Sequence, residues 1–330
     1  MVLHDRRRVL VLGATGTIGR ATVRSLVARG HEVVCFVRPR KGVDGGARGT
    51  RLPGEAATRY GDVTDPVSLG RDGICGERFD AVISCLASRT GAPRDAWAID
   101  HRAHLHALEA ARAARIPHFI LLSALCVQKP QLTFQRAKLA FEEALIHSGL
   151  TYSIVRPTAF FKSLAGQLGR VRRGKPFLLF GDGALTACKP IADADLADFL
   201  VDCLHDRLRH DRILPIGGPG PAITPRQQGE ALFALLGQAP RFRQVPVKLL
   251  DGIVAVLATL GRVSPALAAK AELARIGRYY ATESMLVLDP ATGRYDADAT
   301  PSTGTETLFD FYARLIEGEI EVDRGEHAVF

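Results

Sequence analysis

The feature that most constrains the fold is a glycine-rich turn near the start of the sequence. Val9–Leu12 predicts a buried strand, and three glycines then turn the chain into a helix that runs to about Arg29. Glycine allows a tight turn and close approach to a pyrophosphate, which the first helical N–H groups and the helix dipole stabilise. We therefore predict a nucleotide site, with a purely structural turn as the alternative. The predicted cofactor-binding residues here are Gly13, Thr15, Gly16, Thr17, Ile18 and Gly19.

The glycines are three residues apart, as G-x-x-G-x-x-G. This spacing resembles the short-chain dehydrogenase/reductase superfamily, in its extended and atypical branches, more than the G-x-G-x-x-G of other dehydrogenases. The resemblance implies an α/β fold with a Rossmann-type, doubly wound parallel sheet. We expect an NADPH-binding domain at residues 1–155. Residues 156–330 are expected to be a smaller, mainly substrate-binding region, with some segments returning to the sheet.

Charge and cysteine content narrow the function classes. The net charge is +8, which favours anionic partners such as NADPH or a carboxylated substrate. The basic residues are scattered and no nucleic-acid-binding module is visible, so we expect no nucleic-acid partner. The six cysteines form no C-x-x-C pair, and we predict no metal site. We expect a reduced, cytoplasmic protein. No apolar h-region follows the polar, basic residues 1–8, so we expect no signal peptide. No apolar run approaches the ~20 residues that span a bilayer.

Cofactor choice is expected to depend on the end of the second strand, His31–Val37. In NAD-dependent Rossmann sites an acidic residue at this place binds the ribose 2′-hydroxyl. This chain has Arg38, followed by Arg40 and Lys41. A guanidinium can bind a 2′-phosphate through two hydrogen bonds, so the sequence predicts NADPH rather than NADH. The alternative is that these are solvated loop charges.

Two further segments are expected to line the cofactor. Arg59–Asp65 resembles the superfamily's Gly-Asp-hydrophobic segment, which implies that Asp62 and Val63 lie at the adenine, although Asp62 could instead cap a turn. A buried strand at Phe79–Leu86 ends in residues that the family places at the central ribose and pyrophosphate. These residues are Ser84, Cys85 and Leu86.

The catalytic segment departs from the superfamily pattern. His118–Ser123 predicts another strand, and a helix follows with Lys138 one turn after Phe134. Typical members have a serine, then Tyr-x-x-x-Lys, in which the tyrosine is the acid and the lysine binds the ribose. Here Ser123 and Lys138 are present, but phenylalanine occupies the tyrosine position and has no proton to give. Phe134 could form an apolar wall against the plane of the substrate, or it could be a core residue.

The segments Ser123–Lys138 and Tyr152–Leu164 closely resemble the NADPH-dependent 3,8-divinyl chlorophyllide a 8-vinyl reductases. Gly181–Gly183 and Cys188–Ala197 also look like that family. The resemblance implies hydride transfer from NADPH to the 8-vinyl group of a Mg-chlorin, divinyl chlorophyllide, in chlorophyll or bacteriochlorophyll biosynthesis. Two rivals stay open: a non-catalytic NADP-binding sensor or assembly factor, and a reductase of another conjugated alkene.

The resemblance also implies roles for the remaining site residues. Arg156, Pro157 and Thr158 would contact the nicotinamide end of the cofactor. Two aromatic rings could face the macrocycle, and Lys162 could pair with a propionate, although a solvated lysine is equally compatible. The predicted substrate-binding residues are Cys126, Gln128, Phe160, Phe161 and Lys162.

The last third predicts a helix near 224–237, a strand near 241–245, and apolar helices near 247–261 and 265–280. Gly252–Leu260 is nearly all apolar. Core packing is the main interpretation, and lining of a chlorin pocket or peripheral contact with a photosynthetic membrane are the alternatives. The sequence does not indicate an oligomeric state.

Overall fold

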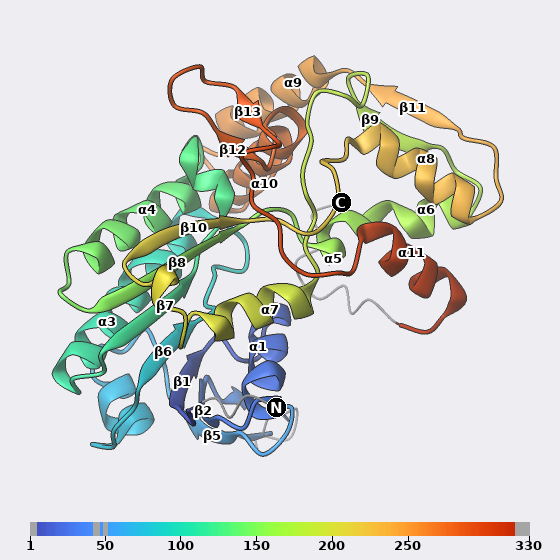
Figure 1. Ribbon diagram of the computed structural model, residues 1–330. Helices are drawn as coiled ribbons and strands as arrows, with labels where there is room; N and C mark the ends of the chain where they lie inside the picture. Colours follow the sequence, from blue (N-terminus) through green and yellow to red (C-terminus); the bar gives the residue numbers. More distant parts are fainter. Residues whose placement is uncertain (1–4, 42–46, 49–51, 321–330) are drawn as a thin grey trace.

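The protein is built around a seven-stranded parallel sheet (Figure 1). The computed structural model describes residues 5–41, 47–48 and 52–320. The strand order is β10-β8-β7-β6-β1-β2-β5, and every neighbouring pair is parallel. From β1 the chain adds β2 and β5 on one side, and then β6, β7, β8 and β10 on the other side. The order of strand addition thus reverses between β1 and β6, and parallel sheets bind ligands at such a switch point. The strands are β1 (Arg8–Leu12), β2 (Glu32–Val37), β5 (Ala57–Tyr60), β6 (Ala81–Ser84), β7 (His118–Leu122), β8 (Thr151–Pro157) and β10 (Arg212–Ile216).

Helices cover both faces of this sheet, so its central strands are buried and apolar on both sides. One face packs against α1 (Thr17–Ala28) and α7 (Asp193–Asp202). The other packs against α3 (His104–Ala113) and α4 (Thr133–Ile146). The helix before α3 begins with α2 (Pro93–Ala96) and continues through a π-helical stretch, Trp97–Ala103. The doubly wound Rossmann-type fold predicted from the sequence is confirmed.

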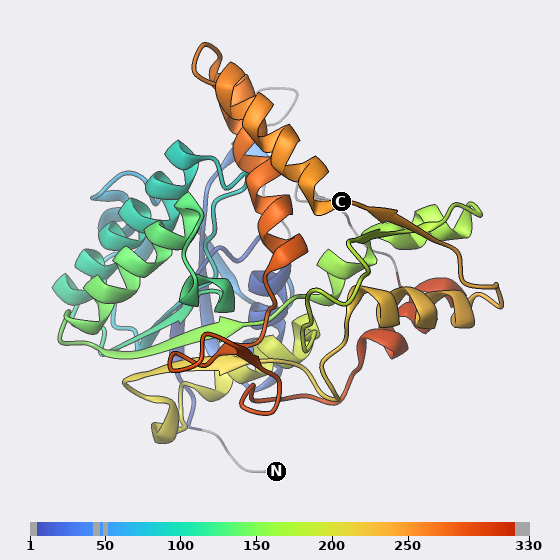
Figure 2. The same ribbon diagram turned by 90° about the horizontal axis from the view of Figure 1, so that it is seen from above.

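The second part of the chain forms a smaller lobe beside the carboxyl ends of the strands (Figures 1 and 2). Its core is separate from that of the sheet. Two segments from beyond residue 157 join the sheet domain, because β10 pairs with β8 and α7 packs on α1. The lobe contains α5 (Phe161–Leu164), α6 (Leu168–Arg172), β9 (Phe177–Phe180), α8 (Pro225–Leu235), β11 (Phe242–Val245) and α11 (Leu308–Glu317).

Two antiparallel helices form a hairpin that projects from the body (Figure 2). They are α9 (Val247–Leu260) and α10 (Pro265–Thr282), and they pack on each other. The expectation of core packing for Gly252–Leu260 is wrong, because no residue of α9 is buried. The hairpin is followed by the short ladder of β12 (Val287–Leu288) and β13 (Tyr295–Asp296).

Two short strands lie between β2 and β5. They are β3 (Arg40–Lys41) and β4 (Ala47–Arg48), which pair antiparallel, and β5 begins at Ala57. Residues 42–46 and 49–51 lie outside the described part. Among the helices that the structure describes, none is both long and apolar enough to cross a membrane.

Candidate active site

The glycine turn joins β1 to α1 at the carboxyl edge of the sheet. Gly13 has a φ of +75°, and a Cβ there would lie 2.6 Å from the Cys85 backbone. A Cβ at Gly19 would lie 2.1 Å from the Gly13 carbonyl oxygen. Both glycines are therefore needed for the protein's own packing. Gly16 is different, because a Cβ there would meet nothing nearer than 3.4 Å, so packing does not explain this glycine.

The open side of the turn has the properties of a phosphate site. Gly16 and Thr17 are exposed, α1 begins without a side-chain cap, and its first turn contains no acidic residue. Unsatisfied N–H groups and the positive end of the helix dipole therefore remain for an anion. Thr15 and Ile18 complete the turn, and Ile18 anchors it in the core.

Lys162 lies at this turn. Its Nζ donates to Thr17 Oγ1 across 3.2 Å, although the two residues are 145 positions apart in sequence. Sequence reasoning placed Lys162 with the substrate, whereas the structure places its ammonium at the predicted phosphate site. A cation there would add to the field of the helix terminus.

Arg38 and Asp62 follow the ends of the neighbouring strands β2 and β5. Arg38 is exposed. Asp62 Oδ1 accepts hydrogen bonds from Thr64 N (2.9 Å) and Thr64 Oγ1 (2.8 Å). These bonds, together with the charge of Arg38, lower the pKa of Asp62. Asp62 thus caps a turn, the alternative that the sequence left open, and Val63 packs beside it against the core.

Lys138 is held by a partner that sequence reasoning missed. Its Nζ lies 3.2 Å from Asp100 Oδ1, and the two side chains are only 10% and 1% exposed. Asp100 comes from the π-helical stretch before α3, and such irregular turns are frequent at functional sites. Asp100 Oδ1 also accepts from Ser88 N–H, whereas Oδ2 is buried without a hydrogen-bond partner among the described residues. A buried acceptor of this kind can receive a ligand hydroxyl or a water.

A histidine one turn further along the same helix fixes the end of β6. His104 Nε2 and Ser84 Oγ are 2.9 Å apart, and Nδ1 lies 2.8 Å from the Ile99 carbonyl oxygen. Burial, aided by the nearby Lys138 charge, lowers the pKa of His104 to about 4, so the imidazole is neutral at physiological pH. Cys85 and Leu86 follow Ser84, and the Cys85 backbone contacts the glycine turn. Among described residues, no group of three or more His, Cys, Asp or Glu side chains could hold a metal ion.

Ser123 belongs to a buried polar triad. Its Oγ donates to Glu142, and Arg156 Nε donates to the same carboxylate across 3.1 Å. Glu142 lies one turn after Lys138 on α4 and is 2% exposed. The triad joins β7, α4 and β8 and satisfies all three groups. Ser123 and Arg156 therefore support the position of Lys138 through α4.

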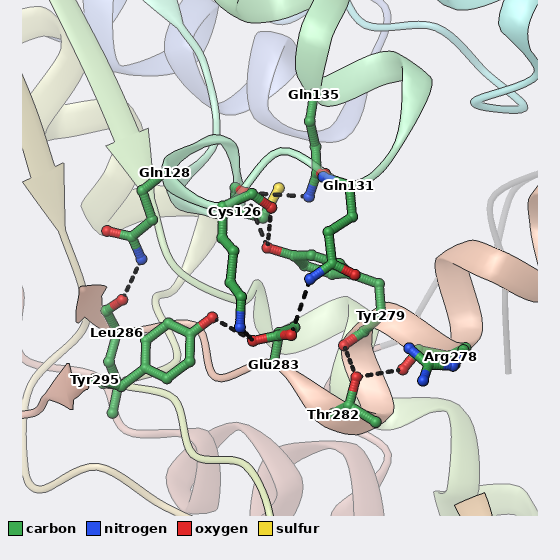
Figure 3. A network of polar contacts seen from close by, with 11 residues as sticks. Cys126, Gln128, Gln131, Gln135, Arg278, Tyr279, Thr282, Glu283, Leu286 and Tyr295 are labelled. Carbon is green, nitrogen blue, oxygen red and sulfur yellow. Dashed lines mark hydrogen bonds and ion pairs between the residues drawn. The ribbon is translucent and has the colours of Figure 1, made fainter. Parts of the chain in front are cut away.

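The turn that follows β7, Leu125–Gln128, is fixed to the last third of the chain (Figure 3). Tyr279 Oη on α10 donates to the Cys126 carbonyl oxygen across 2.9 Å. Gln128 Nε2 donates to Leu286 O (2.5 Å), and its Oε1 accepts from Leu288 N (2.9 Å). Both polar atoms of the Gln128 side-chain amide therefore form hydrogen bonds within the protein.

The other predicted site residues pack in three different clusters. Phe134 packs in the cluster formed by the β7 turn and α10. Phe160 packs against the core of the sheet domain, whereas Phe161 is 2% exposed and packs on Phe311 inside the lobe. Pro157 ends β8, and the hydroxyl of the buried Thr158 donates to the Lys189 carbonyl oxygen. Lys138, Phe134 and Cys126 therefore lie in one region, at the start of α4 and the turn after β7. Phe161 instead belongs to the core of the lobe.

The sequence of the whole chain is similar to proteins of one reductase family. It is 52% identical to the rice protein "divinyl chlorophyllide a 8-vinyl-reductase, chloroplastic" over 98% of this chain and 82% of that protein. The chain belongs to the divinyl chlorophyllide a 8-vinyl-reductase family. The Arabidopsis thaliana protein of the same name is 47% identical, with 96% of this chain and 79% of that protein covered.

Other comparisons agree with the fold and the nucleotide site. An NAD(P)H-binding family profile matches residues 13–207. The structure of an NADPH-dependent quinone oxidoreductase from Escherichia coli has a TM-score of 0.62 at 17% identity, with 93% of this chain and 99% of that chain covered. The photosystem II assembly factor Ycf39 of Guillardia theta is 30% identical over 73% of this chain and 74% of that protein.

Proposed function

We propose that this chain uses NADPH to reduce the 8-vinyl group of divinyl chlorophyllide a to an ethyl group, a step of chlorophyll or bacteriochlorophyll biosynthesis. The sequence identity of 47–52% to reductases of that name, across nearly the whole chain, carries the proposal. The assembly-factor rival has weaker support, since the Ycf39 protein reaches only 30% over 73% of the chain.

The arrangement of the turn and Lys138 supports NADPH as the cofactor. The open side of the glycine turn and the Lys162 ammonium would hold the pyrophosphate. Arg38, at the end of β2, would bind the ribose 2′-phosphate. The side chains of Arg40 and Lys41 lie outside the described residues. Lys138, fixed by Asp100, would hold the nicotinamide ribose at the carboxyl edge of the sheet.

The chemistry of an alkene fits a site without a tyrosine at position 134. Bound NADPH supplies a hydride, and the conjugated macrocycle can spread the resulting negative charge. Carbonyl reduction needs an acid at the developing alkoxide, whereas this reaction needs a proton at a carbon atom. Phe134 cannot supply it, but its ring can form an apolar wall beside Lys138. The chain must therefore orient the pigment and deliver the proton from another group.

The direct test is an anaerobic assay of the purified protein with divinyl chlorophyllide a and NADPH, with pigments separated by chromatography. We expect conversion to the monovinyl pigment without an added iron–sulfur protein or ferredoxin. Arg38→Asp serves as a matched variant, which should turn over less at equal NADPH. NADPH binding without any conversion would favour the sensor or assembly-factor alternative.

We further propose peripheral association with an anionic lipid surface through α9. Its apolar residues repeat at intervals of four and three positions, which places them on one helix face. This apolar stripe consists of Leu249, Ile253, Val256, Leu260 and Val263, the last of which follows the helix. These five residues are 41–84% exposed.

Charge favours a lipid surface over a neutral partner. Lys248 and Arg262 are exposed and adjoin the stripe residues Leu249 and Val263 in sequence, and Lys270 on the packed helix α10 is exposed as well. The acidic Asp251 is instead paired with Arg278 on α10. An apolar face with a cationic rim is the pattern of interfacial helices. Ile253→Asp should abolish flotation with phosphatidylglycerol-containing vesicles, and equal flotation of the variant, or a salt-independent dimer of the wild type, would contradict this assignment.

A further inference from the structure

The site as described contains no acid for the proton that the reduction requires. Position 134, one turn before Lys138, has no hydroxyl. The Ser123 hydroxyl is committed to the Glu142 carboxylate inside the protein. The hairpin helix α10, which comes from far along the chain and packs with Phe134, supplies a candidate.

Helix α10 lies against Phe134 and the β7 turn. A Cβ built on Gly91 would lie 2.7 Å from Ile276 Cδ1 and 3.9 Å from Phe134 Cδ1, so these two side chains flank one point. Tyr279 Oη donates to the carbonyl oxygens of Cys126 (2.9 Å) and Lys129 (3.3 Å). This bifurcated hydrogen bond from a buried hydroxyl fixes the rotation of α10 against the turn (Figure 3).

The next residue, Tyr280, is one turn after Ile276 and therefore on the same side of α10. Its ring stands edge-on to that of Tyr279, with centroids 5.6 Å apart. Its hydroxyl lies 3.9 Å from Cys126 Sγ, while the whole residue is 36% exposed. Tyr280 therefore has an accessible side and a hydroxyl directed at the β7 turn.

The thiol of Cys126, which the Tyr280 hydroxyl faces, lies close to the Lys138 charge. The Lys138 charge acts on the Cys126 thiol, although burial is the main influence and raises the pKa of that thiol. Burial likewise raises the pKa of Tyr280, so both groups keep their protons at neutral pH. Cys126 is 1% exposed and enclosed by protein. Of the two residues, only Tyr280 has exposed surface, and its ring is the part that a bound pigment could contact.

We propose that Tyr280 is the catalytic acid of the reduction, replacing from α10 the hydroxyl that position 134 lacks. This inference rests on the proposed function. The hydride forms a C–H bond at one vinyl carbon, and the alkene electron pair passes to the neighbouring carbon and the macrocycle. The O–H bond of Tyr280 then breaks as its proton forms the second C–H bond. The tyrosinate regains a proton from solvent, so no further oxidant or reductant is needed.

The test compares Tyr280→Phe with Tyr295→Phe. The first variant loses only the hydroxyl at the β7 turn, and its ring still packs on Tyr279. The second is a matched control, because Tyr295 Oη donates to Glu283 (2.7 Å) in the same network without touching Cys126. Both should bind NADPH like the wild type in a fluorescence titration. We expect kcat to fall about 10²-fold or more in Tyr280→Phe alone.

A pH profile separates an acid from a structural role. An acid must be protonated to act, and burial raises the pKa of Tyr280 above its ordinary value of about 10. Wild-type kcat should therefore stay level through neutral pH and fall only above about pH 10, and Tyr280→Phe should lose that fall. Tyr280→Phe with kcat within twofold of wild type, or equal losses in both variants, would overturn the inference. If the wild type forms no monovinyl pigment, the proposed function itself fails. Wild-type turnover with an active Tyr280→Phe refutes only the role of Tyr280.

Discussion

Breaking the buried ion pair between Lys138 and Asp100 should have a cost that can be calculated. Lys138→Met leaves the Asp100 carboxylate, 1% exposed, without the ammonium that lies 3.2 Å away. Such an uncompensated buried charge lowers the free energy of unfolding by about 3–5 kcal/mol. An unfolding entropy of about 2.1 cal/mol/K per residue amounts to about 0.7 kcal/mol/K for 330 residues. The Tm should therefore fall by about 4–7 °C.

Adding Asp100→Asn to Lys138→Met should restore most of the lost Tm, because no buried charge is then left unpaired. The affinity for NADPH should stay weak in the double variant, because both the single and the double variant lack the Lys138 ammonium that would hold the ribose. Circular dichroism gives the Tm, and NADPH fluorescence gives the affinity. Losses of Tm that add in the double variant would refute the pairing. Recovery of NADPH affinity in the double variant would refute the role of Lys138.

Three further predictions follow from the same geometry. Arg38→Asp should reduce the ratio of kcat/KM for NADPH to that for NADH at least tenfold; an unchanged ratio would place the 2′-phosphate elsewhere. Gly16→Ala should fold with a near-normal Tm but bind NADPH weakly. Gly13→Ala should instead be strongly destabilised, because of these two glycines only Gly13 has a positive φ and leaves no room for a Cβ beside the backbone. Equal Tm losses in the two variants would contradict this. The pKa of His104, about 4 when folded, lies below its usual 6.5, so the unfolded chain binds the proton first and stability should fall as pH drops from about 6.5 to 4. His104→Asn should flatten that slope in urea titrations, and an unchanged slope would assign it to other groups.

The sheet and its turn could be predicted because local patterns specify them. Four consecutive apolar residues at Val9–Leu12 form a strand only if both faces are covered, and the following glycines leave few backbone paths. Lys138 could be placed because it is one helical turn after position 134. The local structure of the segments expected to hold the cofactor was therefore predictable from short stretches of sequence.

The partners of these residues could not be read from short segments, since tertiary packing selects them. Asp100 does leave a signal: it interrupts a buried small-residue stripe of Ala96, Ala103 and Ala107, spaced as on one helix face. Nothing local indicates that Tyr280, 154 residues further along the chain, lies against the turn at Cys126. Burial of α9 was predicted wrongly because apolar composition does not reveal whether a neighbouring element covers a helix.

The most direct measurement of the central claim is transfer of a labelled hydride. The purified protein is given divinyl chlorophyllide a and NADPH deuterated at the transferable C4 position, and the product is analysed by mass spectrometry. We predict monovinyl pigment with one deuterium in its 8-ethyl group. Monovinyl pigment without that deuterium, or no monovinyl pigment from a protein that binds NADPH, would contradict the proposed reduction.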